Sequence, residues 1–378
     1  MASSRRLPLA YNTSTYGDVT RDYQVGELTV WEAATDIDLV TATAGEILDC
    51  YDDAASFDDY VAIAGATTNS SYFRVIRPAG VKGQASWQGH DGTPNNGVTF
   101  ICATDVNIFG LQENYSQVQD VIAKVSVASG ISIRYAFAQT SLCNLSAFVG
   151  CIAYDCLIGD TGIGQGFAMA GAASNIGFAV DCLAHNCEGD GFRTSSFVVG
   201  GGGYLYNCTS TNNGTYGFRM LGNQASGIHI RTNCLASSNT TADFSDGTTN
   251  APTRTVTYCA SGDDTADDLG GAGNRISTDG TLVYVNSGGD DFHLAPNDTR
   301  TKDWGTDLSA DGTYAFDDDI DWSKRPCGSA WDISFDECPS LSVALKAFVE
   351  GSLRGSSGSG SFLPDEMNIK RRKKKSEG

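Results

Sequence analysis

The sequence predicts an all-β fold, a parallel β-helix whose coils are about 25 to 26 residues long. Three observations predict it. Stretches that begin with cysteine recur at steps of 26, 26 and 25 residues over the last four copies. Phenylalanines recur in phase with them. The intervening residues alternate apolar with small or polar side chains and end in Asn, Gly, Ser and Asp clusters, which is typical of short strands and turns.

The first marker is the cysteine that opens each repeat. The copies read CIAYDC, CLAHNC, CTSTNN, CLASSN and CASGDD, and they begin at Cys151, Cys182, Cys208, Cys234 and Cys259. Because equivalent residues of stacked coils lie above one another, we expect these side chains to form an inward-facing ladder of small apolar groups. Regular stacking at one position favours free thiols, and disulfides are the alternative.

The second marker is a phenylalanine that follows glycine in the first three copies. The residues are Phe167, Phe192, Phe218 and Phe244, at steps of 25, 26 and 26. We expect their rings to stack in the core. The repeat that begins at Cys151 has about six additional residues around LIGDTG. This predicts a loop inserted into that coil.

The stretch CLAHNCEGDGF, residues 182–192, raises the alternative of a zinc site. A Cys-x4-Cys pair with an intervening His on a strand directs its donors to opposite faces, so the spacing does not suit one metal centre. We therefore predict no metal site here, and we expect a chelator to leave the labelling of Cys182 and Cys187 unchanged. Acidic runs at 263–268 and 317–321 could hold Ca²⁺ through carboxylate oxygens, with exposed loops as the alternative. No other cofactor is expected.

The chain divides into three parts. Residues 1–28 are expected to be an irregular N-terminal arm. Residues 29–338 form the β-helix domain, with the most regular coils at about 98–262. A short helix in LTVWEAATDIDLV would cap the first coil, because an open parallel edge invites aggregation. Residues 339–378 form an irregular C-terminal extension with a Gly/Ser linker and the basic tail KRRKKK.

Charge separates the body of the protein from this tail. The 378 residues carry a formal net charge of −20, and without residues 370–375 and Glu377 the balance is 19 basic against 44 acidic residues, near −25. An acidic body repels nucleic acid and membrane surfaces, so neither is expected as a partner. A short basic run after a Gly/Ser linker is most often a solvated end, and the sharper alternative is that the tail anchors the protein on an acidic surface of another subunit. Its basic residues are Lys370, Arg371, Arg372, Lys373, Lys374 and Lys375.

The N-terminal residues MASSRRLPLAYNTSTYGD have a basic start without an apolar core of signal-peptide length. No later segment approaches the length of a transmembrane helix. We therefore expect neither a secretion signal nor a membrane span.

The segments that flank the coils carry a resemblance to a known family. They are WEAATDIDLVTATAGEILDCYDDAASFDDYVAIAG on one side and DDFHLAP followed by DDDIDWSKRPCGSAWDISFDE on the other. With the coils, residues 29–338 resemble right-handed parallel β-helix proteins of the pectate-lyase-like superfamily, and the terminal segment is similar to the closing segment of phage and bacterial-surface β-helix proteins. Where the family has a Ser-Pro-Ala-Ile-Asp run, this chain has NDTRTKDWGTD. The resemblance implies a right-handed winding and leaves the activity open.

Catalysis is one function that the resemblance implies. Polysaccharide lyases of this fold use a basic residue beside acids that bind calcium, and hydrolases use paired carboxylates. The residues that register places near one shallow groove are Asp160, Glu188, Asp190, Arg193 and Arg219. The alternative is that they are solvated turn residues. No complete lyase or hydrolase motif is present, so catalysis is not the favoured expectation.

The favoured expectation is a phage virion structural protein of the capsid decoration or tailspike/fibre type, which presents a rigid β-helix on the particle surface. It would be a homotrimer that contacts capsid or tail proteins, with host-surface glycans as a further partner. Phage proteins are released by lysis and need no secretion signal, and unpaired thiols fit assembly in a reducing cytoplasm. A polysaccharide depolymerase is the first alternative, and a cell-surface adhesin is the second.

Overall fold

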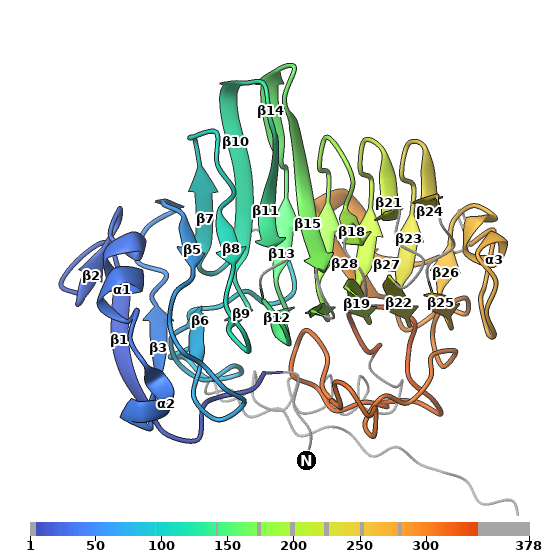
Figure 1. Ribbon diagram of the computed structural model, residues 1–378. Coiled ribbons are helices and arrows are strands. Elements are labelled where there is room, and N and C mark those ends of the chain that lie inside the picture. Colours follow the sequence, from blue (N-terminus) through green and yellow to red (C-terminus); the bar gives the residue numbers. More distant parts are fainter. Residues whose placement is uncertain are drawn as a thin grey trace, which may run out of the picture. The chain divides into compact units, whose positions relative to one another are not determined.

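The computed structural model describes residues 5–94, 96–140, 143–171, 175–196, 201–222, 227–249, 253–278 and 282–338. The chain divides into a unit of residues 1–338 and a unit of residues 339–378, and every described residue belongs to the first. That unit is a parallel β-solenoid, so the predicted all-β fold of stacked coils is confirmed (Figure 1). The linker and the basic residues 370–375 lie outside the described residues.

Apart from one antiparallel pair near the C-terminal end, the described strands form three parallel sheets that are the walls of the solenoid. In each sheet, a strand pairs with the equivalent strand of the next coil, which explains the period of the sequence. Sheet 1 has ten described strands, in the order β2 (Tyr23–Gln24), β1 (Tyr11–Gly17), β3 (Gly45–Cys50), β6 (Arg74–Pro78), β9 (Gln117–Gln119), β12 (Ser146–Val149), β16 (Ile176–Val180), β19 (Gly202–Tyr206), β22 (Ile228–Thr232) and β25 (Thr253–Thr257).

The other two sheets follow the same rule. Sheet 2 contains β4 (Phe57–Asp58), β7 (Thr99–Cys102), β10 (Ile122–Gly130), β13 (Ile152–Tyr154), β17 (Leu183–His185), β20 (Thr209–Thr211), β23 (Leu235–Ser237) and β26 (Ala260–Ser261), with β14 (Leu157–Asp160) paired to β10. Sheet 3 contains β5 (Val61–Ile63), β8 (Phe109–Leu111), β11 (Ile133–Gln139), β15 (Ile163–Gly171), β18 (Phe192–Ser196), β21 (Tyr216–Gly222) and β24 (Ala242–Thr248).

One corner of the coil, between sheets 1 and 2, has a left-handed backbone. Its φ values lie between 51° and 61° at Asp120, Gly150, Asp181, Asn207, Asn233 and Tyr258. Gly, Asn and Asp adopt this conformation at the lowest cost, which explains why five of these six positions hold them. The ladder cysteine follows directly after the corner in each of the last five coils.

The cysteines that follow these corners are fully buried inside the solenoid. The Cys182 thiol is representative, because its Sγ lies 3.4 Å from the Phe148 carbonyl oxygen and 3.3 Å from that of Val180. Each thiol is thus a small side chain that donates weakly to backbone carbonyls. All twelve cysteines of the chain lie in the described residues, and all are free.

The phenylalanine markers pair in register along sheet 3 and point into the same core. The ring centroids of Phe192 lie 4.6 Å from those of Phe167 and 5.0 Å from those of Phe218, and the ring planes differ by 5° and 17°. Phe244 continues the stack at 5.0 Å. The lumen is therefore filled by like residues placed one above another.

The N-terminal residues are more regular than the sequence analysis expects. Instead of an irregular arm over residues 1–28, strand β1 adds to the edge of sheet 1 by pairing with β3, and β2 pairs with β1. The stretch YNTSTYG has the Tyr and Thr content of a strand but none of the repeat markers. Tyr16 of β1 is fully buried, so this strand belongs to the first coil.

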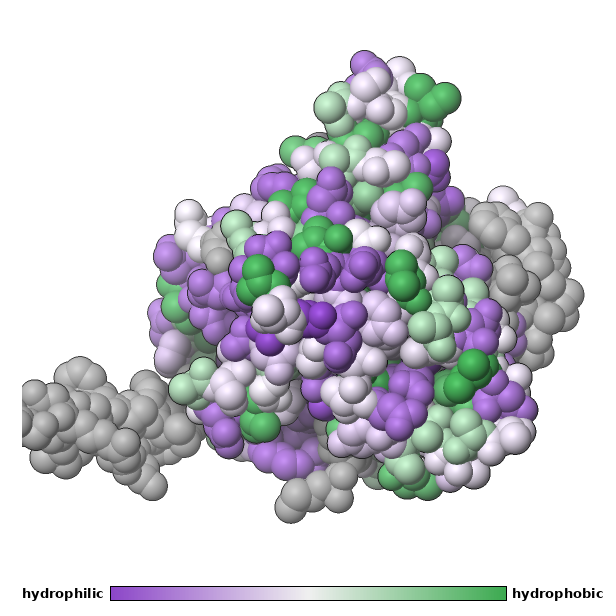
Figure 2. All heavy atoms as spheres, turned by 90° about the vertical axis from the view of Figure 1, so that its left-hand side faces the viewer, coloured by the Kyte–Doolittle hydropathy of each residue, from purple (hydrophilic) through white to green (hydrophobic). Residues whose placement is uncertain are grey.

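Short helices accompany this end of the solenoid. Helix α1 (Leu28–Ala34) buries Leu28 and Trp31 in the main core, and α2 (Leu39–Ala42) follows it. Figure 2 shows this end of the molecule with hydrophobic residues scattered among hydrophilic ones. A third helix, α3 (Thr265–Asp268), follows the last coil. None of the helices in the described residues has the length and hydropathy that crossing a bilayer requires.

Residues 282–338, which we call the C-terminal strap, run back along the solenoid. The strap contains an antiparallel pair, β27 (Tyr284–Asn286) and β28 (Asp291–Leu294), and a short 3-10 helix, η1 (Ser287–Gly289). Its apolar side chains pack on outward-facing residues of sheets 1 and 2. Tyr314, Phe316 and Trp331 cover sheet 1, and Phe292, Ile320 and Phe335 cover sheet 2.

Four strands extend beyond the other coils and form a projection that we call the fin, residues 126–135 and 157–165 (Figure 1). In the fin β10 pairs with β14, and β11 pairs with β15. The sequence analysis places an insertion only in the coil that begins at Cys151, whereas the preceding coil extends with it. Both coils must extend because each strand needs a neighbour for its backbone groups. Ile131, at the tip, is 82 % exposed.

Candidate functional site

The outer face of sheet 3 carries a continuous row of residues. Backbone register places these side chains one above another, opposite the buried phenylalanines. The row consists of Ala62, Gly110, Ala138, Ala168, Arg193, Arg219 and Ser245. Four small residues are thus followed by two arginines, at a spacing of about 4.8 Å per coil.

A depression of about 390 Å³ lies at the N-terminal end of this row. Its floor includes Ala62, Gly110 and Ala138, and its walls include Glu32 of α1 and Tyr60. The small residues of the row create this hollow, because longer side chains at these positions would fill it.

The arginine pair lies at the other end of the row, beside aromatic and acidic groups. The guanidinium of Arg219 lies 4.8 Å from the ring centroid of Tyr216, and its Nη1 lies 3.7 Å from Asp190 Oδ2. Burial raises the pKa of Tyr135, and the charge of the neighbouring Arg193 offsets part of this increase. The structure therefore brings together three of the five predicted site residues, Asp190, Arg193 and Arg219.

Asp190 is held inside the fold rather than presented to a substrate. It is 1 % exposed, and the Thr215 hydroxyl donates to its Oδ1. From inside the fold, its carboxylate helps to position the guanidinium of Arg219. An acid that is closed off and paired with a cation in this way is poorly placed to exchange protons with a substrate.

The other two acids support the fin. Glu188 Oε2 accepts hydrogen bonds from the backbone amides of Ile158 at 3.1 Å and Gly164 at 3.2 Å, at the base of the fin. Asp160 lies in the fin, where it has a φ of 62° and accepts from the Ser129 hydroxyl. The five residues therefore do not form one cluster of exposed carboxylates, which a glycoside hydrolase requires. The arrangement on sheet 3 can bind a ligand through guanidinium donors and aromatic rings.

No family model, curated protein or solved structure matches the chain. Function therefore has to be inferred from the fold and from the side chains that it places together.

The stretch CLAHNCEGDGF separates its metal-ligating side chains. Cys182 and Cys187 belong to the solenoid core. His185 packs on the outside of sheet 2, where its ring lies 4.4 Å from that of Phe292 in the strap and its Nδ1 lies 3.3 Å from the Thr211 carbonyl oxygen. Burial lowers the pKa of His185. The stretch is a strand with two different faces and not a metal centre.

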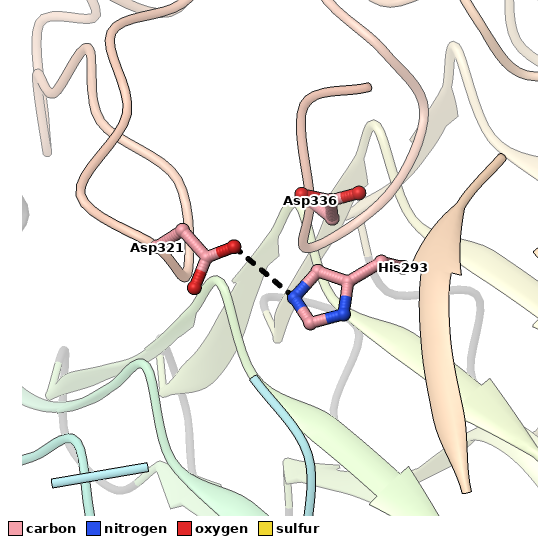
Figure 3. A group of neighbouring side chains, drawn as sticks. All are labelled: His293, Asp321 and Asp336. Carbon is pink, nitrogen blue, oxygen red and sulfur yellow. Dashed lines mark ion pairs between the residues drawn. The ribbon is translucent and has the colours of Figure 1, made fainter. Parts of the chain in front are cut away.

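A group that the sequence analysis misses lies at the strap: His293, Asp321 and Asp336, with one possible ligand atom of each within 4.8 Å of the others (Figure 3). His293 Nδ1 lies 2.6 Å from Asp291 Oδ1, and its Nε2 lies 3.2 Å from Asp321 Oδ2. These residues are distant in the sequence and follow no repeat. The sequence analysis considers Asp321 only as part of the acidic run 317–321, and only the Asp-x-His spacing of Asp291 and His293 could have drawn attention to the histidine.

This group already contains its own cations. Burial alone would lower the pKa of His293, yet the hydrogen bond with Asp291 and the nearby carboxylate of Asp321 raise it to about 11, which favours an imidazolium. Lys82 Nζ lies 3.0 Å from Asp321 Oδ1. A divalent ion would have to displace the ring proton and compete with the ammonium. The group is therefore best described as an ion-pair network that fastens the strap to the coils.

The acidic runs considered for Ca²⁺ cap turns of the backbone. Asp263 Oδ1 accepts from the Thr265 amide at 2.9 Å. Asp319 Oδ1 accepts from the amides of Asp321 and Ser323, both at 2.8 Å. Such carboxylates are engaged locally, and calcium binding by these runs stays a prediction.

Proposed function

We propose that the protein is a noncatalytic structural protein of a phage virion, of the capsid decoration or tailspike type, whose solenoid presents a binding face on the particle surface. The single observation that carries this proposal is the burial of Asp190, whose Oδ2 lies 3.7 Å from Arg219 Nη1 of sheet 3. The acid supports a cation, and the surface presents donors and rings without a carboxylate pair for catalysis.

Two further features support a particle component. Twelve free cysteines suit a protein that folds and assembles in a reducing compartment. The strap covers sheets 1 and 2 with apolar and charged contacts, which stiffens a repeat architecture that otherwise depends on contacts between neighbouring coils. A stiff body with one patterned face suits display. The homotrimer, its contacts with capsid or tail proteins and anchoring through residues 370–375 belong to this proposal.

The ligand that we propose for the face is a host-surface glycan. The ring of Tyr216 offers an apolar surface to a sugar, and Arg193 and Arg219 offer donors to hydroxyl or carboxylate oxygens. Binding of the full chain to a panel of bacterial surface polysaccharides tests this. The double variant Arg193→Met/Arg219→Met should bind at least tenfold more weakly. Arg134→Met is the matched control, because Arg134 lies in the fin and pairs with Asp105.

The same assay separates binding from depolymerisation. We expect no release of reducing ends or of unsaturated products from a polysaccharide that binds. Cleavage that Asp190→Asn abolishes would replace this proposal with a depolymerase. Location on the particle is tested independently, because a structural protein must co-sediment with purified virions.

A further inference from the structure

The interior of the solenoid, which is apolar along most of its length, contains polar side chains near the C-terminal coils. The inward row of sheet 1 runs in register through Phe148, Ala179, Leu205, Arg231 and Val256. Arg231 thus occupies a position that is apolar in the coils on both sides. His229 precedes it by two residues on β22 and faces the same way. Both side chains are fully buried, at 0 % exposure.

The hydroxyl of Thr194 contacts both residues and indicates which ring nitrogen of His229 carries the proton. Thr194 Oγ1 accepts from Arg231 Nη2 at 2.9 Å and lies 2.8 Å from His229 Nδ1. A guanidinium only donates, so the arrangement that also uses the threonine proton directs it to Nδ1. Burial lowers the pKa of His229 to about 3, so the ring is neutral and its proton is on Nε2.

Three buried nitrogens are then left over, and all are donors. Arg231 Nε, Arg231 Nη1 and His229 Nε2 have no hydrogen-bond partner among the described residues. An unmatched buried donor destabilises the fold, and more so when it is charged. Burial lowers the pKa of Arg231 only to about 10, so the guanidinium keeps its charge at neutral pH. The lumen therefore contains a positive charge and an excess of donors.

The possible counter-ions among the described residues are thiolates of Cys234 and Cys259, which lie near Arg231. Burial opposes the ionisation of Cys234, whereas hydrogen bonds with Cys208 and Cys259 and the charge of Arg231 lower its pKa. The geometry favours the protonated thiol. Cys234 Sγ lies 3.3 Å from the Leu205 carbonyl oxygen and 3.6 Å from that of Thr232. A thiol donates to such oxygens, whereas a thiolate is repelled by them. Cys259 Sγ likewise lies 3.5 Å from the Arg231 carbonyl oxygen and 3.4 Å from that of Thr257. As thiols, both cysteines leave the charge of Arg231 uncompensated.

We propose that the solenoid lumen holds a small monovalent anion, of which chloride is the simplest, bound by Arg231 and His229. A water molecule suits this position less well, because the unpartnered side-chain atoms of Arg231 and His229 are donors and cannot accept from its two hydrogens. The anion must be small, since Leu205 and Val256 occupy the same row on either side of Arg231 and are fully buried. It would be enclosed as the coils close during folding, so its exchange in the folded protein should be slow.

Crystals of the full chain, refolded and grown in bromide in place of chloride, test the proposal directly. We expect an anomalous peak within hydrogen-bonding distance of Arg231 Nε or Nη1 and of His229 Nε2. Water alone at this position, or a guanidinium that contacts only the Cys234 sulfur, would overturn the proposal.

A solution experiment tests the energetics with the same chain. Protein refolded in chloride should unfold with a Tm about 3 °C or more above that of protein refolded in methanesulfonate at equal ionic strength. Arg231→Met should lose this difference. Arg134→Met should keep it, because Arg134 lies in the fin and pairs with Asp105. Equal Tm values for the wild type in the two salts would contradict the proposal, and the bromide map decides if Arg231→Met does not fold.

Discussion

The regular coils, residues 98–262, and the C-terminal strap are held together in different ways. In the coils, like residues stack at equivalent positions, as Phe192 does between Phe167 and Phe218. In the strap, charges that occur once are buried against distant partners. Arg325 is fully buried and joins Asp181 of a coil corner at 3.2 Å and Glu337 at 2.9 Å.

The difference separates what builds the solenoid from what orients the strap. A stacked coil gains nearly the same contact energy from each neighbour, so its stability is approximately a sum over coils. A buried ion pair gives little net stability when complete, but loss of one partner leaves a charge without compensation. We therefore expect substitutions in the strap to be more severe and more localised than substitutions in the ladders.

The largest effect is expected for Arg325→Met. It leaves Asp181 and Glu337 buried without a cation, which should destabilise the folded protein by about 3 to 5 kcal/mol. Urea unfolding gives the free energy, and limited proteolysis should cut within residues 282–338 first. Lys324→Met is the matched control, because the Lys324 side chain is 54 % exposed and its loss should cost no more than about 0.5 kcal/mol. If both variants lost the same free energy of unfolding, the proposed difference between the strap and the coils would be wrong.

Acid should weaken the contacts around His90, between the coils and the loop at residues 79–97, before it affects the ladders. His90 is fully buried, its Nε2 lies 2.7 Å from the Gly150 carbonyl oxygen, and its Nδ1 accepts from the Gly92 amide at 3.1 Å. Burial lowers its pKa to about 4, below an unfolded value of about 6.5. The unfolded state therefore binds the proton first as the pH falls.

The neutral His90 ring therefore makes its full contribution to the free energy of unfolding above about pH 6.5. Between pH 6.5 and 4 this contribution is lost, at up to about 1.4 kcal/mol per pH unit. Urea unfolding at a series of pH values measures the slope. His90→Gln, which cannot titrate, should flatten it over this window. An unchanged slope would show that other groups control the acid response.

A smaller effect is expected for Phe192→Leu in the middle of the phenylalanine stack. The substitution keeps an apolar side chain but loses ring contacts on both sides, which should cost about 1 to 2 kcal/mol. The loss should appear as a lower urea midpoint for the whole solenoid, with no selective cleavage of the strap. Leu157→Ala, at a half-exposed position of the fin, is the control and should be nearly neutral.

The smallest effect is expected for a ladder cysteine. Cys208→Ala removes one buried sulfur that contacts the carbonyl oxygens of Ala179 and Tyr206 at 3.4 Å, and should cost about 1 kcal/mol. Cys182→Ala should cost nearly the same, because it occupies the equivalent position. Calorimetry of the two variants checks this equivalence, and a difference of more than about 1 kcal/mol would mean that the ladder positions are not interchangeable.

The sequence predicts the cysteine and phenylalanine ladders because the same residue recurs at the same position of each repeat. Phe192 and Phe218 recur at the coil period, so their contact can be read without the structure. The strap gives no such signal, because Arg325 and Asp181 are 144 residues apart and each occurs once. The strand at β1 lacks the markers and was expected to be irregular.

The candidate site shows the same limit. The register of Arg193 and Arg219 follows from the period, whereas the burial of Asp190 depends on the Thr215 hydroxyl and on packing around it. Glu188 looks like a groove residue in the sequence, but the fin requires an acceptor for its backbone amides. The period of the repeat does not predict where a side chain at a corner of the coil points.

Electron microscopy of purified virions labelled with an antibody against this protein tests the central claim most directly. The account predicts label on the particles, on the shell for a decoration protein or on the tail for a tailspike. Particles without label, in a lysate that contains the protein, would contradict a structural role and would direct attention to glycan-active proteins.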